Sequence, residues 1–294
     1  MKNTIQTSET FFSFQGEKSV GYPQVWIRTT KCNFECRGFG NPENKDTTLI
    51  STIGFDPKNY ATLESMPVIT TGCDSSYSWS PLFEHTWTTW TFDELAQNLL
   101  DTIPHHSFLH PKTHQRVGLA ITGGEPTLKL RELSEFLFHP KLIDLQTVTF
   151  ETNCSVPIRE AQIIRLNQWL DQNPNNQIVW SNSPKLSNSG EKWDDAIKPS
   201  VALRQRALHP GRFQQYFKFV SDGSDKSFEE IERAMDAYRS AGVPDNTEVW
   251  IMPEGATLEQ QNGVDARICD AAMARGYNVA PRVHVYVYGN KVGT

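Results

Sequence analysis

Residues 117–128 read VGLAITGGEPTL, a short apolar run that ends in two glycines and is followed by a proline. The run is typical of a buried strand, and Pro126 suits the first turn of a helix. Gly123 and Gly124 allow the backbone to approach a ligand closely, and the carboxylate of Glu125 can accept hydrogen bonds from an ammonium group. We therefore predict a strand–turn–helix unit with a binding site at the end of its strand.

The same alternation of strand and helix continues on both sides of this unit. Further β-rich runs lie at residues 24–28, 147–150, 178–180, 215–220, 247–252 and 282–288. Amphipathic helical segments lie at residues 128–138, 158–170, 226–242 and 257–276. This alternation predicts an α/β fold of parallel βαβ units, closed or nearly closed into a barrel. In such sheets, ligands bind at the carboxyl ends of the strands.

The composition is that of a globular protein. The chain has 294 residues, of which 38% are hydrophobic and 21% charged, and its formal net charge is −6. This charge gives no overall attraction to nucleic acid or to an acidic membrane. No apolar run approaches the roughly 18 residues that span a bilayer, and the first residues show no signal-peptide pattern. We expect a single cytoplasmic domain, residues 1–294, without a membrane or direct nucleic-acid partner.

Several potential metal ligands are assigned to the scaffold. The five cysteines lie at positions 32, 36, 73, 154 and 269. An odd number in a reducing compartment argues against a disulfide framework. We interpret Cys154 and Cys269 as structural residues. Four histidines occur in residues 103–115, but their spacing fits no helix face, and this stretch is interpreted as a solvated loop.

Two cysteines, Cys32 and Cys36, form a CxxxC pair directly after the strand at residues 24–28. Thiolates bind iron–sulfur clusters and zinc, but two of them do not complete such a site. The nearby position where a third ligand is expected holds Phe39. Residues 37–72 form a long irregular segment rich in Gly, Pro, Asn, Asp and Thr, and such a segment inside a compact domain is usually functional or disordered.

The order of these motifs resembles the radical S-adenosylmethionine superfamily, in which CxxxC follows the first barrel strand and GGEP follows the second. Within it, the chain is similar over nearly its whole length to the 7-carboxy-7-deazaguanine synthase family. The matching motifs are QGE (15–17), the strand and cysteines of 24–36, ETN (151–153), SPKL (183–186), YFKFV (216–220) and IMPEGAT (251–257). The resemblance implies a single-domain partial (β/α)6 barrel with parallel strands and an extended cluster-binding loop.

The stretch GCDSSYSW, residues 72–79, extends this resemblance. In the family, the third cluster cysteine is followed by Asp, a hydroxyl residue and an aromatic run, and Cys73 begins the same order here. The resemblance implies that residues 37–72 are inserted between the second and third ligands. It implies a [4Fe–4S] cluster on three residues: Cys32, Cys36 and Cys73.

The resemblance also implies S-adenosylmethionine and Mg²⁺ as cofactors. The residues implied for S-adenosylmethionine are Gly123, Gly124, Glu125, Thr152, Asn153, Ser183, Lys185, Met252 and Pro253. Ser75 stands beside Asp74 where the family has a hydroxyl ligand of Mg²⁺, more often Thr, and oxygen ligands suit this ion. The ETN and SPK motifs have an alternative interpretation as helix caps, since Ser, Thr and Asn are favoured there.

The implied substrate is a small pterin, 6-carboxy-5,6,7,8-tetrahydropterin. The implied reaction is its radical-mediated ring contraction to 7-carboxy-7-deazaguanine with loss of ammonia, in 7-deazapurine biosynthesis. The implied substrate residues are Gln15, Glu17, Arg28 and His284, and the planar guanidinium of Arg28 can pair with the carboxylate. Arg282 and Lys291 are further candidates. The family also implies an electron donor such as flavodoxin, and a homodimer.

Two other functions stay open. The stretch CNFECRGFGNPE (32–43) resembles the glycyl-radical activase of anaerobic ribonucleotide reductase. However, Phe39 replaces the cysteine that this family requires, and the chain is much longer than its members. The second alternative is a non-catalytic regulatory module that binds zinc or no cluster, and the missing cysteine at position 39 motivates it.

Overall fold

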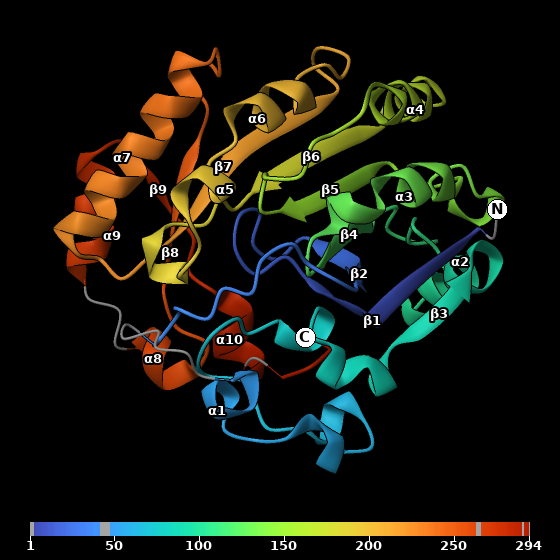
Figure 1. Ribbon diagram of the computed structural model, residues 1–294. Coiled ribbons are helices and arrows are strands. Elements are labelled where there is room, and N and C mark those ends of the chain that lie inside the picture. The colour runs from blue at the N-terminus through green and yellow to red at the C-terminus, as the bar shows by residue number, and fades with distance from the viewer. Residues whose placement is uncertain (1–2, 42–47, 263–265, 290, 294) are drawn as a thin grey trace.

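The computed structural model describes residues 3–41, 48–262, 266–289 and 291–293. Their central element is a nine-stranded sheet in the order β3-β1-β2-β4-β5-β6-β7-β8-β9 (Figure 1). The strands are β1 Thr4–Phe14, β2 Pro23–Thr29, β3 Thr88–Thr91, β4 Gly118–Gly123, β5 Thr147–Thr152, β6 Gln177–Asn182, β7 Phe213–Ser221, β8 Val249–Pro253 and β9 Asn278–Val279. Neighbours from β2 to β9 pair in parallel, whereas β1 pairs antiparallel with β2 and β3. The predicted α/β class is confirmed, and the open sheet is consistent with a partial barrel.

The longer helices cover the outer face of this sheet. The helices are α1 Leu49–Ile53, α2 Phe92–Thr102, α3 Leu130–Phe136, α4 Glu160–Asp171, α5 Trp193–Ala196, α6 Pro199–Gln205, α7 Asp225–Ser240, α8 Leu258–Asn262, α9 Ala266–Ala274 and α10 Val283–Tyr288. Figure 1 shows α3, α4, α6 and α7 along the outer side of the sheet. Helices α8 and α10 lie together elsewhere, joined by a hydrogen bond of 3.1 Å from the Tyr286 hydroxyl to the Gln261 carbonyl.

The central strands are short apolar runs because they are buried on both faces. Leu119, Ala120 and Ile121 are consecutive in β4, and all three are fully buried. This pattern is typical of parallel sheets covered by crossover helices. The rings of Phe150 in β5 and Trp180 in β6 stack with centroids 4.9 Å apart. Burial of such residues is the main favourable contribution to folding, and it fixes the position of the strand ends that carry the site.

The prediction of a strand at residues 282–288 is wrong, because Val283–Tyr288 form helix α10. The neighbouring strand β9 has only two residues, and its ladder ends where the Ala280 amide donates to the Ile251 carbonyl. Pro281 follows and has no N–H to continue the ladder. The Val283 amide then donates to the Gly16 carbonyl at 2.8 Å. Tertiary contacts thus override the β-propensity of alternating Val and Tyr residues.

The irregular segment of residues 37–72 packs its own small apolar cluster. Within it, the structure describes α1 and two short 3-10 turns, Pro57–Asn59 and Leu63–Ser65. The buried side chains of the cluster are Leu49, Leu63, Ile69, Tyr77 and Phe83, and the last two lie beyond the segment. The segment is therefore packed against the residues that follow Cys73.

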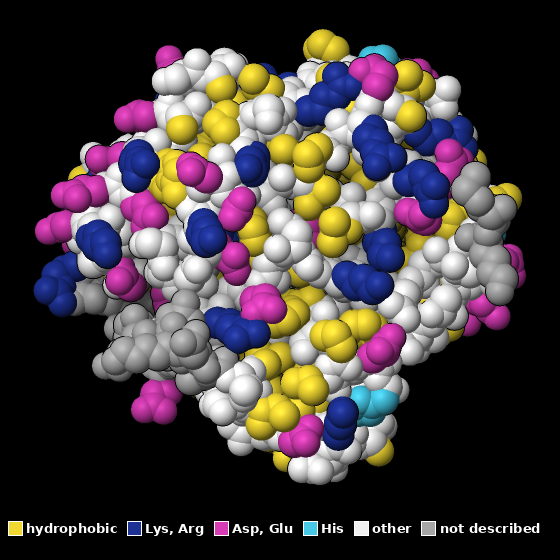
Figure 2. All heavy atoms as spheres, in the orientation of Figure 1, with side chains coloured by type: hydrophobic (Ala, Val, Ile, Leu, Met, Phe, Trp, Pro, Cys, Tyr) yellow, Lys and Arg dark blue, Asp and Glu magenta, His cyan; other side chains and the backbone are white. Residues whose placement is uncertain are grey.

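The surface carries both signs of charge. On the face drawn in Figure 2, Lys and Arg side chains are interspersed with Asp and Glu. Across the residues that the structure describes, no helix combines the length and apolar character needed to cross a membrane.

Candidate active site

The carboxyl ends of the parallel strands open onto one cavity of about 670 Å³. The strands contribute Arg28 from β2, Gly123 from β4, Glu151 and Thr152 from β5, Lys218 from β7, and Met252 and Pro253 from β8. The QGE turn, the cysteine loop, part of residues 63–70 and the start of α10 complete the lining. Of the site residues predicted from the sequence, only Glu125 does not line this cavity.

The three predicted cluster cysteines lie together on the cavity wall. Cys36 is buried with Phe34 and Ala196, and Cys32 and Cys73 pack against this group. Burial raises the pKa of Cys32 to about 12 and raises the pKa of Cys36 and Cys73 as well. A negative charge on Cys73 would raise the pKa of either partner further. The structure therefore brings the sulfur atoms close enough to interact electrostatically.

Cys73 reaches this position because the long segment returns to its starting point. The Gly72 amide donates to the Phe39 carbonyl at 2.7 Å. Gly72 has a φ of +76°, a conformation that glycine adopts without strain. Phe39 occupies the position where a nearby third cysteine was expected. Gly72 contacts Phe39, and Cys73 is the next residue after Gly72, so Cys73 lies close to that position. The loop geometry thus compensates for the distance in sequence.

Two anchors hold the first two cysteines. The amides of Glu35 and Cys36 both donate to Oε1 of Glu191, at 2.9 and 2.8 Å. The Lys31 amide donates to the Ser78 carbonyl at 2.8 Å, and the Lys31 carbonyl accepts from the Glu125 amide at 2.9 Å. Cys36 has a φ of +49°, an unusual value for a residue other than glycine, Asn or Asp. These contacts define the loop before any ligand is added.

The two glycines of GGEP pack against this cysteine loop. A Cβ atom on Gly123 would lie 2.1 Å from the Thr29 carbonyl oxygen, and one on Gly124 would lie 2.1 Å from that of Lys31. Gly123 also has a φ of +122°. Both positions therefore require glycine, since backbone atoms occupy the space of any side chain.

Glu125 is buried beside the cavity, in contact with protein groups. Its Oε1 accepts hydrogen bonds from the Thr127 amide at 2.9 Å, from the Thr127 hydroxyl and from the Thr152 hydroxyl at 2.7 Å. Its Oε2 accepts from the Asn153 amide at 2.7 Å. Burial raises the pKa of this carboxyl, and the four hydrogen bonds act in the opposite direction. Glu125 thus connects the ends of β4 and β5, where Thr152 and Asn153 line the cavity.

Lys185 is the cation common to the three thiols. Burial is the largest influence on the pKa of each cysteine, and the positive charge of Lys185 acts to lower each of them. Its Nζ also donates to the Ser183 hydroxyl at 3.3 Å. Since a thiolate is the form that binds metal, this charge favours the ligand state of the cysteines.

A buried charged group forms another wall of the cavity. Nζ of Lys218 pairs with the carboxylate of Glu17 and, at 3.2 Å, with that of Glu151. Gln15 Nε2 donates to Glu151 Oε1 at 3.1 Å. Burial alone would lower the pKa of Lys218, but the two carboxylates outweigh it and raise that pKa. These groups present polar atoms to the cavity.

Two arginines lie on either side of Asp74 and Ser75. Arg28 Nη1 donates to the Ser75 hydroxyl at 3.1 Å, and Arg282 Nη2 pairs with Asp74 Oδ2 at 2.8 Å. His284 lines the same region, and burial together with the charge of Arg282 lowers the pKa of its imidazole to about 4. This histidine is therefore neutral at physiological pH.

Relatives of the chain carry a single name. A 7-carboxy-7-deazaguanine synthase from Pyrobaculum aerophilum is 29% identical over 290 residues, which are 98% of this chain and 97% of the relative. Proteins with the same name from Rhodopirellula baltica and Halobacterium salinarum are 24% and 26% identical, and cover 100% and 97% of this chain. No protein-family model matches the chain.

The chain is similar over nearly its whole length to proteins named 7-carboxy-7-deazaguanine synthase. The relatives align end to end with it, so the similarity covers the whole cavity and is not restricted to the cysteine motif. The shared name of these relatives implies radical S-adenosylmethionine chemistry with a [4Fe–4S] cluster.

The residues of this chain fit such a cluster. Three thiols share an apolar wall that also holds Phe34 and Phe39, next to the cation of Lys185. Within the described ranges, no three His, Cys, Asp or Glu side chains converge on a single metal ion. A cluster does not need that arrangement, because each thiolate binds a different iron.

The residues do not fit Mg²⁺ equally well. Ser75, the expected hydroxyl ligand, accepts from Arg28 and donates to Asp74 Oδ1 at 3.3 Å, while Asp74 Oδ2 is held by Arg282. The expected ligand Ser75 and its neighbour Asp74 are thus both in contact with guanidinium groups. Mg²⁺ needs only one or two protein oxygens, since it keeps several waters, but both oxygens available here are already hydrogen-bonded to cations.

Tyr77, Glu151 and Lys218 line the cavity but were not identified as site residues by the sequence analysis. Lys218 had a usable signal, since it interrupts the apolar strand YFKFV. Phe217 and Phe219 are buried in the core, while Lys218 and Val220 line the cavity. Because neighbouring residues of a strand point to opposite faces, a lysine between two core residues indicates the face of the strand that is directed toward the site.

Proposed function

We propose that the chain is a 7-carboxy-7-deazaguanine synthase, a radical S-adenosylmethionine lyase that contracts the ring of 6-carboxy-5,6,7,8-tetrahydropterin with loss of ammonia. The observation that carries this proposal is the shared cavity. It joins the three cysteines to the buried polar group of Gln15, Glu17, Glu151 and Lys218. End-to-end similarity to three proteins with this name supports it.

In this proposal each wall of the cavity has its own role. Cys32, Cys36 and Cys73 hold the cluster, and Gly123 and Gly124 lie at the methionine ammonium of S-adenosylmethionine. Its methionine carboxylate and ribose are bound by Thr152, Asn153, Ser183 and Lys185. Met252 and Pro253 border its adenine. Glu125 acts as a positioning residue, since its carboxylate holds Thr152 and Asn153 rather than facing the cavity.

The pterin would lie against the charged wall. Gln15 and Glu17 read its polar edge, Arg28 pairs with its carboxylate, and neutral His284 lies nearby. The cluster and S-adenosylmethionine, when bound, supply the radical chemistry that removes a hydrogen atom from the substrate. The protein binds and orients the two molecules and excludes water, for which the enclosed position of the site is suited.

Further parts of the proposal concern organisation. We treat residues 1–294 as one domain, because one sheet and one main core contain the described strands. We interpret residues 37–72 as an insertion that covers the cavity, since Leu63, Met66 and Ile69 line it. A cytoplasmic location, a homodimer and a flavodoxin-type electron donor follow from the family resemblance, and a reducing compartment suits free thiols and a cluster.

An anaerobic assay tests the function. The reconstituted protein is mixed with the carboxypterin, S-adenosylmethionine and dithionite, and products are identified by mass spectrometry. We expect 7-carboxy-7-deazaguanine and ammonia. S-adenosylmethionine cleavage without any conversion of the pterin would contradict the proposal and favour the glycyl-radical activase. One zinc per chain and no labile sulfide would favour the regulatory module.

A further inference from the structure

We infer that Arg28 and Arg282 together form the carboxylate-binding site of the substrate, and that this pair replaces Mg²⁺ in this chain. The inference rests on the proposed function, because it concerns how the carboxylate of the pterin is held. It adds a second arginine to the site and removes one cofactor from the reaction.

Arg28 is held rigidly by its neighbours. Its Nε pairs with Glu9 Oε1 at 2.6 Å, and the Tyr77 hydroxyl donates to the same oxygen at 3.0 Å. The guanidinium lies over the rings of Tyr77 and Phe11, with its carbon 5.4 and 5.9 Å from their centroids. Nη1 then donates to Ser75. A guanidinium fixed in this way loses little conformational freedom when a carboxylate binds.

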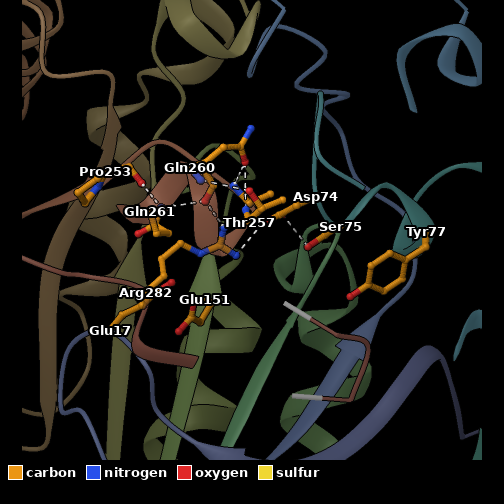
Figure 3. Close-up of polar contacts among 12 residues, drawn as sticks. Glu17, Asp74, Ser75, Tyr77, Glu151, Pro253, Thr257, Gln260, Gln261 and Arg282 are labelled. Atoms are coloured by element: carbon orange, nitrogen blue, oxygen red, sulfur yellow. Dashed lines mark hydrogen bonds and ion pairs between the residues drawn. The ribbon is translucent and has the colours of Figure 1, made fainter. Parts of the chain in front are cut away.

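Arg282 is held from the opposite side. Figure 3 shows its side chain extending from the start of α10 toward Asp74. Nη2 pairs with Asp74, and Nη1 donates to the Gly255 carbonyl at 2.9 Å. The same carbonyl accepts from Gln261 Nε2 at 2.9 Å, so its position is itself fixed. The side chain of Arg282 is only 11% exposed.

Arg282 keeps one unused donor. Its Nε is buried and has no hydrogen-bond acceptor among the described residues. A buried guanidinium N–H without an acceptor is costly, and such orphan groups in native structures are commonly satisfied by a ligand or ordered water. Because Arg282 lines the cavity, an acceptor on the substrate is the group that we assign to this donor.

The same contacts exclude the expected ion. Ser75 is the hydroxyl ligand that the family resemblance implies, and Asp74 stands beside it. Each of the two already contacts a guanidinium. A divalent cation would have to displace these two guanidinium contacts before it could bind the oxygen atoms. A carboxylate is instead matched to a guanidinium in both geometry and charge. The negative charges of Glu9 and Asp74 balance the positive charges of the two arginines. Binding of the substrate carboxylate therefore depends on guanidinium N–H groups that point toward it, and not on a net positive charge of the site.

The first test measures the effect of Mg²⁺ on the unmodified holoenzyme. Product formation is compared after desalting, with EDTA or with excess MgCl₂, and the iron content is checked in each arm. We expect the rate to change by less than about twofold. A larger stimulation by Mg²⁺ would overturn the inference. If no arm forms product, the proposed function fails, and the following measurement still decides the cation question.

The second test measures cation binding directly. Mn²⁺, which takes the same kind of oxygen ligands as Mg²⁺, is titrated into the anaerobic holoenzyme with S-adenosylmethionine and carboxypterin present. We expect the EPR signal of free Mn²⁺ to match that of a protein-free sample. Loss of that signal at one equivalent per chain would show a bound cation. This result would contradict the inference whether or not product is formed.

Variants test the role of Arg282. Arg282→Met should raise the KM for the carboxypterin by about tenfold or more with a smaller effect on kcat, since it removes ground-state contacts. It should also create stimulation by Mg²⁺, because Asp74 loses its guanidinium partner. Arg275→Met, which removes a surface pair with Glu232, is the matched control and should change neither value. An unchanged KM in folded, iron-containing Arg282→Met would overturn the assignment.

Discussion

The Gly72 amide donates to the Phe39 carbonyl at 2.7 Å, so the long irregular segment begins and ends at the same place beside the cysteine loop. This contact places Cys73 within reach of Cys32 and Cys36. It also means that the segment is not needed to span a distance. Its role lies in what it covers.

Shortening this segment should therefore spare the cluster and expose it. We expect a variant in which a short Gly-Ser link replaces residues 41–70 to retain its iron after anaerobic reconstitution. Oxygen should bleach its iron–sulfur absorbance faster than that of the full chain, because Leu63, Met66 and Ile69 no longer line the cavity. Equal bleaching rates would show that the segment does not protect the site.

Gly124→Ala should disturb the cysteine loop. The added Cβ would lie 2.1 Å from the Lys31 carbonyl oxygen and 3.0 Å from the Cys32 Cβ. Such overpacking costs about 1–3 kcal/mol and would shift the loop that holds the first ligand. We expect lower iron content after reconstitution. Gly118→Ala, in the same strand, meets nothing closer than 3.4 Å and serves as the control. Full iron content in both variants would refute this explanation.

Lys218→Met should destabilise the protein strongly. It leaves Glu17 and Glu151, whose side chains are 12% and 17% exposed, as neighbouring carboxylates without their shared cation. Removal of one partner from a buried ion pair costs about 3–5 kcal/mol. Urea unfolding under anaerobic conditions should show this loss. Converting both glutamates to glutamine in the same variant should restore most of it, and failure to do so would indicate that packing, not charge, is responsible.

His284 should remain neutral down to mildly acidic pH. Burial and the charge of Arg282 lower its pKa from 6.5 to about 4, although Glu17 and Asp74 act to raise it and Lys218 to lower it. Because the unfolded chain then binds a proton more readily than the folded one, the free energy of unfolding falls as the pH drops from 6.5 to 4. The slope is at most about 1.4 kcal/mol per pH unit for one group.

The matched variant for this prediction is His284→Asn. Its free energy of unfolding should depend less steeply on pH in the same window, since the titrating group is absent. Parallel curves for the two proteins, or an NMR titration of the His284 ring centred near pH 6.5, would contradict the predicted pKa.

Much of the fold was predictable because the parallel strands are buried on both faces. Residues 117–121 and 147–150 are short apolar runs, and glycine or polar residues follow them. The C-terminal run RVHVYVY misled the prediction, since its alternation is typical of a strand. Its helical conformation depends on the contact of Val283 with Gly16, which no local pattern reveals. The antiparallel β1 was not identified for a similar reason, because the stretch around FFSFQGE was interpreted only as a motif.

The candidate site was predictable where sequence motifs mark the ends of strands. The prediction was incomplete where a site residue depends on contacts with residues distant in the sequence. A Cβ on Gly16 would lie 2.2 Å from His284 Nδ1, so the glycine of QGE leaves room for a histidine near the other end of the chain. The position of Glu125 also differs from the expectation. Its carboxylate accepts hydrogen bonds from Thr127, Thr152 and Asn153, and these residues come together only in the folded sheet.

The most direct test is the iron and labile-sulfide content of anaerobically reconstituted Cys73→Ala, measured beside Cys269→Ala and the unmodified chain. We predict about four irons and four sulfides per chain, with the EPR spectrum of a reduced [4Fe–4S] cluster, in the unmodified protein and in Cys269→Ala. Cys73→Ala should hold substantially less of both. A complete cluster in Cys73→Ala would show that the third ligand lies elsewhere, and would contradict the account at its base.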